Sequence, residues 1–285
     1  QIDVLLISGD VFDVANPSAS AQRRFFHFLK EVNYKNPGLQ IVVIAGNHDS
    51  AARLEAPNPL LEEWNTSVVG MVRRTDNGEI DLDSLLVPLY NRDGKRQAWC
   101  MAVPYLRQGD YPSPSEEETN TYVAGVARLY KELYGYIVSK KNENEAVIAM
   151  GHLYAANAEL SQDDRSERII MGGLESVSVD AFDLGISYTA LGHIHKAQRV
   201  GGRENVRYAG SPLPMSFSEE NYTHQVVTVY IENGKEPIIN RVQIPLLTRL
   251  MRIPIQPDVP ENIFPLLAEL PEIEDMKEEE NKYPY

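Results

Sequence analysis

Apolar residues follow two different spacings along the chain, and the spacing changes from segment to segment. Short continuous runs rich in Val, Ile and Leu are typical of buried strands. We predict such strands at residues 4–8, 40–45, 82–90, 97–103, 146–150 and 186–191. Apolar positions at helical spacing indicate amphipathic helices, which we predict at residues 19–32, 58–64 and 119–139. Because strands and helices alternate, we expect an α/β fold.

The segments become shorter after about residue 195. Glycines mark predicted turns at residues 201–202 and 233–234, and apolar stretches of strand length lie on either side of them. The region up to about residue 244 is therefore expected to form short antiparallel strands.

Prolines become frequent from residue 245 onward, which is typical of a linker. A strand is predicted at residues 250–255 and an acidic helix at residues 261–270. We therefore predict a first domain at residues 1–245 and the start of a smaller, incomplete domain at residues 246–285.

The chain begins inside its first predicted strand, without an initiating methionine, and it stops after an acidic segment with no evident cap. A natural terminus rarely falls inside a buried strand. We therefore expect sequence to be missing before Gln1, including the first strand of the fold, and also after Tyr285.

Composition narrows the class of protein. Of the 285 residues, 43% are hydrophobic and 24% are charged, which excludes a disordered chain, a collagen-like fibre and a coiled-coil rod. The single cysteine, Cys100, excludes a disulfide scaffold and a zinc site built from several thiolates. The sequence contains neither an apolar run of the ~20 residues needed to cross a bilayer nor a secretion signal. We expect a cytoplasmic enzyme with no membrane partner.

The formal net charge of −14 argues against a protein that coats nucleic acid by bulk electrostatics. The acidity is uneven, because residues 261–285 contain eight acidic and two basic residues. The remainder is only mildly acidic, so nucleic-acid binding would require a local basic surface.

Four short polar motifs follow predicted strands. They are Gly9-Asp10, Gly46-Asn47-His48-Asp49, Gly151-His152 and Gly192-His193-Ile194-His195. Each motif alone is also consistent with an ordinary turn. The carboxyl ends of strands are where α/β sheets bind ligands, however. Carboxylate, amide and imidazole donors together suit Mn²⁺, Fe²⁺ or Zn²⁺. The full set therefore predicts a metal site.

The order of these motifs resembles that of the calcineurin-like metallophosphoesterases, over nearly the whole chain. Within that family, the segments at residues 9–13 and 210–217 and the proline-rich exit look like the nuclease subunits of bacterial double-strand-break repair complexes. The Ser/Thr phosphatase branch fits poorly, because Val14-Ala15 and Asp49 stand where that branch has Arg-Gly and Glu. The resemblance implies a four-layer αββα sandwich followed by the start of a small α+β capping domain.

The resemblance also implies two divalent metal ions, of which Mn²⁺ is the expected element, bridged by Asp10. One ion would bind Asn47, His152 and His193. The other would bind His195 together with an Asp-x-His motif, which this sequence lacks. We therefore expect one complete site and one incomplete, weakly binding site.

Other roles follow from the same resemblance. His48 is expected to stabilise or protonate the leaving 3′ oxygen rather than to bind metal. Asp13 would orient His48 or, equally well, cap the helix that begins at residue 19. Asp49 is expected to fix its loop by hydrogen bonds.

Two further sets of residues have no assigned chemistry. Tyr208, Met215 and Phe217 would form a lip facing DNA or would simply pack. His27, in the core or on the surface of a helix, and His224, at the start of a strand, are expected to have no chemical role.

The expected function is that of a metal-dependent DNA nuclease. It would act as an exonuclease on double-stranded DNA and as an endonuclease on single-stranded or hairpin DNA, in repair, recombination and replication. Its partners would be DNA, a coiled-coil ATPase and a second copy of itself. Two alternatives remain open, namely a phosphodiesterase or phosphatase for a small ester and a non-catalytic scaffold that docks the ATPase.

Overall fold

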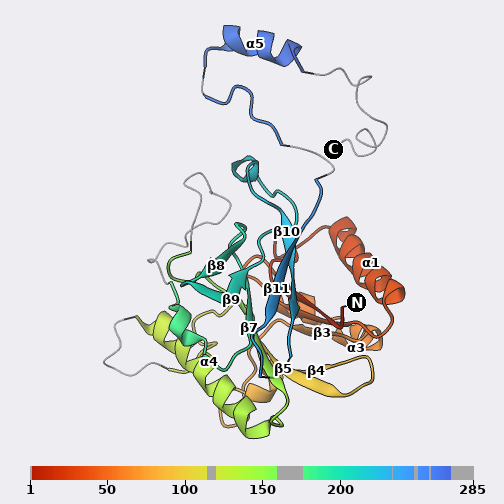
Figure 1. Cartoon of the computed structure of the whole chain (residues 1–285), viewed down its shortest axis with the longest axis vertical. Helices are drawn as coiled ribbons and strands as arrows, with labels where there is room; N and C mark the ends of the chain where they lie inside the picture. The colour runs from red at the N-terminus through yellow and green to blue at the C-terminus, as the bar shows by residue number, and fades with distance from the viewer. Residues whose placement is uncertain are drawn as a thin grey trace.

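Two stacked β-sheets form the centre of the molecule (Figure 1). The computed structural model describes residues 2–113, 120–158, 176–232, 234–246, 250–256 and 258–270. The small sheet has the strand order β1-β2-β3 and is entirely parallel. Its strands are β1 (Val4–Ser8), β2 (Gln40–Ile44) and β3 (Thr66–Val69).

The large sheet has the order β4-β5-β6-β7-β9-β8. Its strands are β4 (Leu86–Tyr90), β5 (Arg96–Ala102), β6 (Ala146–His152), β7 (Tyr188–Gly192), β8 (Gln198–Val200) and β9 (Arg203–Tyr208). Strands β5, β6, β7 and β9 are parallel, whereas the edge strands β4 and β8 are antiparallel to their neighbours. A separate antiparallel pair consists of β10 (Gln225–Tyr230) and β11 (Ile238–Gln243).

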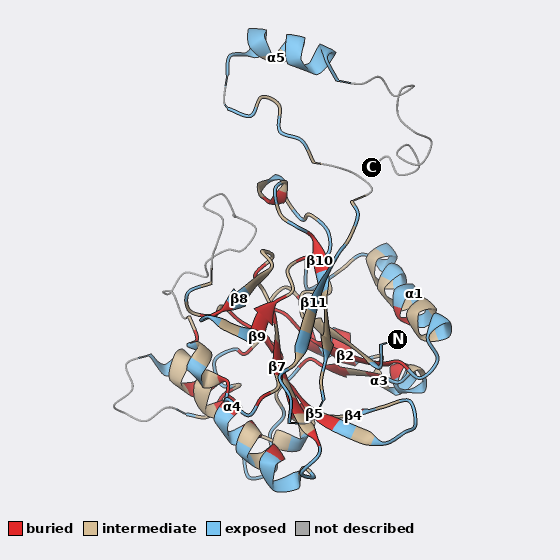
Figure 2. Cartoon of the chain, in the orientation of Figure 1, coloured by how far each residue is buried: buried red, intermediate tan, exposed pale blue. Residues whose placement is uncertain are grey.

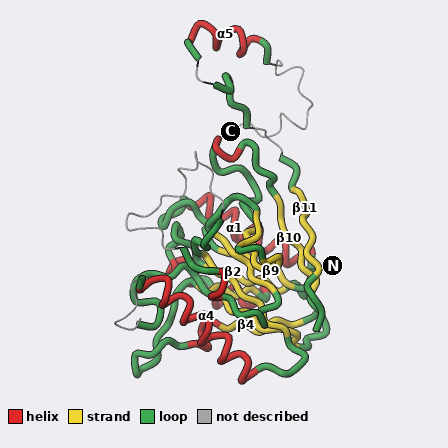
Figure 3. The backbone as a smooth tube through the Cα atoms, turned by 60° about the vertical axis from the view of Figure 1, so that its left-hand side comes forward, coloured by secondary structure: helices red, strands yellow, loops and turns green. Residues whose placement is uncertain are grey.

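Helices cover the outer faces of the two sheets, as the views in Figure 1 and Figure 3 both show. Helix α1 (Ala19–Lys35) packs on the small sheet, and α4 (Thr121–Lys140) packs on the large sheet. Two short helices follow β2, namely α2 (Ala51–Glu55) and α3 (Asn58–Leu61). Single 3₁₀ turns occur at Glu62–Trp64, Leu82–Leu85, Val179–Ala181 and Phe217–Glu219. The order α1, small sheet, large sheet, α4 confirms the predicted αββα sandwich.

Strand β2 shows why the layers stack in this order. Side chains alternate between the two faces of a strand, and every residue of β2 is buried. Ile41 and Val43 pack in one cluster with Leu29 of α1. Val42 and Ile44 belong to the other cluster, which also contains α4 and the large sheet. A continuous apolar run in the sequence therefore marks a strand covered on both faces, and Figure 2 shows the buried residues concentrated in the sheets.

Helix ends are set by local polar contacts. The Ser18 side chain accepts a hydrogen bond from the backbone N–H of Ala21 and so caps α1. Asn120 caps α4 in the same way through the N–H of Val123. These contacts satisfy backbone donors that have no partner within the helix.

Several predicted elements need correction. The strand predicted at residues 82–90 begins only at Leu86, because the preceding residues form a 3₁₀ turn. Strand β3 and helix α2 were not predicted, since both are short and lie beside other elements. Residues 250–255 do not form the predicted strand, because Pro254 interrupts the segment and, in the part of the chain that the structure describes, no strand pairs with it.

The predicted acidic helix is present as α5 (Pro260–Ala268), which lies apart from the sheets in Figure 1 and contains no buried residue. The domain boundary near residue 245 stays a prediction. The turn residue 233 and the acidic tail beyond residue 270 lie outside the described residues. Within the described ranges, we find no helix whose length and apolar character would suit a bilayer crossing.

Candidate metal centre

The four polar motifs meet at one edge of the sandwich. Strands β1 and β2 run parallel, as do β6 and β7, and β1 packs against both β6 and β7. The carboxyl ends of all four strands therefore meet where the two sheets face each other.

Glycines allow the two sheets to approach so closely. Gly9 has a φ of +89°, and a Cβ atom at this position would clash with the His152 ring and lie 2.9 Å from the Cα atom of Gly46. A Cβ at Gly192 would clash with the carbonyl oxygen of Ser8. Both positions are thus closed to any side chain.

His152 joins the two sheets. It is almost fully buried, and its Nδ1 lies 2.8 Å from the carbonyl oxygen of Ser8, to which it donates. Its Nε2 lies 3.1 Å from Oδ2 of Asp10 and 2.9 Å from Oδ1 of Asn47. Because Nδ1 donates to the carbonyl of Ser8, Nε2 is the ring nitrogen that faces the oxygens of Asp10 and Asn47.

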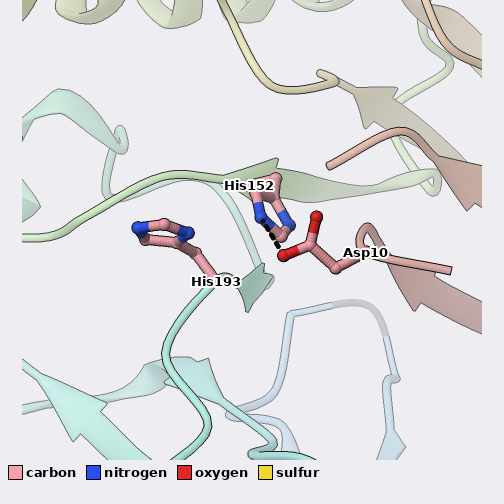
Figure 4. A group of neighbouring side chains, drawn as sticks. All are labelled: Asp10, His152 and His193. Atoms are coloured by element: carbon pink, nitrogen blue, oxygen red, sulfur yellow. Dashed lines mark ion pairs between the residues drawn. The ribbon is translucent and has the colours of Figure 1, made fainter. Parts of the chain in front are cut away.

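His193 completes this group. Its Nδ1 lies 3.1 Å from Oδ1 of Asn47, and its ring centroid lies 5.2 Å from that of His152. Donor atoms of Asp10, His152 and His193 all lie within 4.8 Å of one another, and Figure 4 shows the Asp10 carboxylate facing the His152 ring with the His193 ring beside them. A divalent cation would satisfy their converging lone pairs, so the residues fit a metal ion.

Protonation in the site favours metal binding. Burial, assisted by the neighbouring His152, lowers the pKa of His193 to about 3, so its imidazole is neutral at pH 7. Burial tends to raise the pKa of Asp10, but hydrogen bonds and charge interactions with His152 and His48 outweigh it and hold the pKa below its usual value. Neutral imidazole and ionised carboxylate are the forms that bind metals.

The backbone of the site carries strain. Asp10 and His193 have φ values of 49° and 100°, in the left-handed region. This region costs a residue with a side chain about 1–2 kcal/mol. Such conformations persist where the surrounding structure enforces them, often at functional sites.

His195 lies outside this three-residue group but has a defined partner. Its Nδ1 lies 2.8 Å from Oε1 of Glu219, a carboxylate with no exposed surface. Sequence reasoning missed Glu219, because no spacing relates it to the histidine motif.

His48 stands beside the group without joining it. Its backbone N–H donates to Oδ1 of Asp10 at 3.0 Å. Its Nδ1 lies 2.8 Å from the backbone oxygen of Asp13, whereas the Asp13 carboxylate is 4.0 Å away and 84% exposed. Asp13 therefore contacts His48 through its main chain. The alternative role of Asp13 as a helix cap is wrong, because Ser18 caps α1.

Asp49 ties the loops after β1 and β2 together. Its buried carboxylate accepts hydrogen bonds from the backbone N–H groups of Val11, Phe12 and Gly46 at 2.9–3.1 Å. Burial is the main cause of its raised pKa. The predicted structural role of Asp49 is confirmed.

The residues proposed for a lip fall into two groups. Tyr208 is fully buried, and its hydroxyl donates to the carbonyl of Leu153, so it belongs to the core. Met215 and Phe217 are 59% and 57% exposed. Of the two remaining histidines, His27 is exposed on α1 and His224 is buried beside Ser211.

An aromatic residue and a cation that the sequence did not suggest lie next to His152. The ring of Tyr105 stands edge-on to that of His152, with a centroid distance of 6.2 Å. The Arg107 guanidinium lies 5.8 Å from the Tyr105 ring centroid. Both residues follow β5, which ends at the same edge of the large sheet as β6.

Comparisons with known proteins agree with this geometry. The family model for calcineurin-like phosphoesterases matches residues 1–197. A relative in Rhodobacter capsulatus, named as the SbcD subunit of the nuclease SbcCD, is 39% identical over 265 residues, which cover 91% of this chain and 64% of the relative. The protein of that name in Escherichia coli K12 is 32% identical over 86% of this chain and 59% of the relative. The one in Bacillus subtilis is 31% identical over 83% of this chain and 58% of the relative.

The chain thus spans about three fifths of the length of these curated relatives. The family match covers the αββα sandwich from β1 to β7 and includes all four polar motifs. The chain belongs to the calcineurin-like phosphoesterase family.

Proposed function

We propose that the chain is the catalytic part of a metal-dependent DNA nuclease of the SbcD type. The observation that carries this proposal is the convergence of Asp10, Asn47, His152 and His193 from four separate strand ends. The name shared by the relatives, a nuclease subunit, supports DNA as the substrate.

The donor set suits two divalent ions. Asp10, Asn47, His152 and His193 would hold one ion, and Asp10 and His195 would contribute to the second. Mixed oxygen and imidazole donors without a thiolate favour Mn²⁺ among the candidate metals. When bound, a pair of such ions neutralises charge on a phosphodiester and lowers the pKa of a water molecule.

Residues of this chain would move the protons. The His48 side chain is about one third exposed and so is accessible to a substrate. The Asp13 carbonyl accepts from its Nδ1, which leaves Nε2 of the protonated ring to donate to the leaving 3′ oxygen. Asp13 is therefore a positioning residue that acts through its main chain.

We further propose exonuclease action on double-stranded DNA and endonuclease action on single-stranded or hairpin DNA, in repair, recombination and replication. The relatives are named as subunits of an SbcCD complex, so an SbcC-like coiled-coil ATPase is the proposed partner. A homodimer is proposed as well.

A second candidate is a phosphodiesterase or phosphatase for a small phosphate ester. The net charge of −14 favours it, because such a substrate needs no extended basic surface. The same metal-binding residues would serve both reactions.

One experiment separates these functions. The full-length protein with Mn²⁺ is incubated with end-labelled duplex, with hairpin DNA and with a chromogenic phosphodiester. Cleavage of DNA that is lost in Asp10→Asn and kept in His27→Ala, a change at an exposed position on α1, supports the nuclease. Hydrolysis of the chromogenic diester alone supports the second candidate, and hydrolysis of neither substrate contradicts both.

A further inference from the structure

Glu219 is a fully buried carboxylate at the end of the 3₁₀ turn Phe217–Glu219. Burying a charge is costly unless hydrogen bonds compensate for it. Three polar contacts compensate for the burial of Glu219, with His195, Met215 and Ser211. The group is therefore a hydrogen-bond acceptor inside the protein.

The contacts of Glu219 are divided between its two oxygens. Oε1 lies 2.8 Å from Nδ1 of His195. Oε2 accepts from the backbone N–H of Met215 at 3.0 Å and from the hydroxyl of Ser211 at 3.2 Å. One carboxylate thus connects His195 with both ends of the loop at residues 211–215.

We propose that Glu219 is a positioning residue of the metal centre, which holds His195 with its proton on Nδ1, so that Nε2 is the nitrogen that would bind the second divalent ion. The inference rests on the proposed function and names a residue on which that function depends. Glu219 already accepts two hydrogen bonds at Oε2, and in its 2.8 Å contact with Oε1 the ring nitrogen Nδ1 is the donor. The hydrogen bond made by one imidazole nitrogen fixes the tautomer of the ring, and the tautomer decides which nitrogen can bind metal.

The position of the loop at residues 211–215 affects the contact between Glu219 and His195. Leu213, Met215 and Phe217 expose apolar side chains close to the contacts of Glu219. Because the Met215 N–H bonds to the same oxygen as Ser211, the position of this loop helps to set the position of the carboxylate. Ser211→Ala removes one of the two contacts to Oε2 and should therefore weaken the orientation of His195 less than Glu219→Gln does.

The first test is independent of metal binding and of activity. The full-length protein is labelled with ¹⁵N-histidine and freed of metal by a chelator, and the His195 signals are assigned with a His195→Asn variant. We expect Nδ1 of His195 to carry a proton in the wild-type protein. A ring protonated only on Nε2 overturns the proposal, whether or not the protein cleaves DNA.

The second test uses an isosteric variant. In Glu219→Gln, the side-chain amide can donate to Nδ1 and move the proton to Nε2, which removes the lone pair for the metal. We expect Mn²⁺ affinity at the weaker of the two sites to fall about 10–100-fold by calorimetry, the usual effect of losing such a partner. Unchanged affinity at both sites in a folded variant overturns the proposal.

The matched control is Glu145→Gln. Glu145 is also a buried carboxylate, but it pairs with Arg96 beside the start of β6, at the opposite edge of the large sheet. Its substitution should leave Mn²⁺ binding unchanged. A wild-type protein that binds no Mn²⁺ would contradict the proposed function, while the tautomer measurement would still decide the role of Glu219.

Discussion

The Nε2 atom of His152, at the end of a strand in the large sheet, lies 3.1 Å from Oδ2 of Asp10, which follows a strand of the small sheet. The other nitrogen of the same ring is bonded to the carbonyl of Ser8 in β1. The ring therefore cannot turn away from Asp10 without losing a contact between the sheets. Packing of the two sheets and assembly of the metal centre depend on the same contacts.

Gly9→Ala should disrupt both the packing of the two sheets and the metal centre. The added Cβ would clash with the His152 ring in addition to the strain of a positive φ. We expect a lower free energy of unfolding and a loss of Mn²⁺ binding, measured by denaturant titration and calorimetry.

The control for Gly9 is Gly94→Ala. Gly94 also has a positive φ, +74°, but a Cβ there would meet nothing within 4 Å. It should show only the conformational cost of about 1–2 kcal/mol and normal Mn²⁺ binding. Equal behaviour of the two variants would mean that the close approach at Gly9 is unimportant.

Neighbouring residues of one motif should respond differently to substitution. Asn47→Ala removes an oxygen that faces both His152 and His193, so metal content should fall. His48→Ala should leave metal content nearly unchanged but reduce turnover about 10²–10⁴-fold, the usual contribution of a general acid. Metal content is measured by elemental analysis and turnover by DNA cleavage. Equal metal loss in both variants would identify His48 as a ligand.

Local signals in the sequence were sufficient for much of this site. The run at residues 4–8 and the glycine that follows it predict both a buried strand and a sharp turn before Asp10, because these features depend only on neighbouring residues. In the same way, local sequence predicts the buried strand β2 and the turn that places Asn47 after it. That these residues meet follows from the parallel direction of the strands.

Other features depend on residues that are distant in sequence. Glu219 and Tyr105 acquire their roles only because folding brings them to His195 and His152. Asp13 was predicted to orient His48, and its backbone carbonyl, not its carboxylate, makes the closer contact. A pattern of side chains cannot show which main-chain atom will face a ring.

The stability of the metal-free protein should depend on pH through His193. Its pKa is lowered to about 3, from an ordinary value of 6.5. Between these values the unfolded chain binds a proton at this residue and the folded protein does not. Stability should therefore fall as the pH falls below about 6.5, with a slope of up to about 1.4 kcal/mol per pH unit from this group.

Denaturant titrations between pH 7.5 and pH 5 in the presence of a chelator measure this slope. His193→Gln removes the titrating group and should reduce the slope. His27→Gln, at an exposed site on α1, should leave it unchanged. The same slope in the wild-type protein and in His193→Gln would contradict the assignment.

Arg107 should contribute to DNA binding if the proposed function is correct. An acidic protein needs local cations to attract a polyanion, and Arg107 is exposed at the edge where the metal-binding residues meet. It is connected to His152 through the ring of Tyr105, which contacts both residues. Arg107→Ala should weaken the binding of duplex DNA and make the negative slope of log K against log salt shallower by about 0.9, the value for one phosphate contact.

Hydrolysis of a small chromogenic diester by Arg107→Ala should remain near the wild-type rate, because that substrate does not extend beyond the metal centre. Lys95→Ala provides the control, since Lys95 is an exposed cation in the turn before β5, at the opposite end of that strand. Its salt slope should match the wild-type value. If Arg107→Ala also keeps the wild-type slope, the DNA backbone does not pass over Tyr105, and the cations that bind it must lie elsewhere around the site.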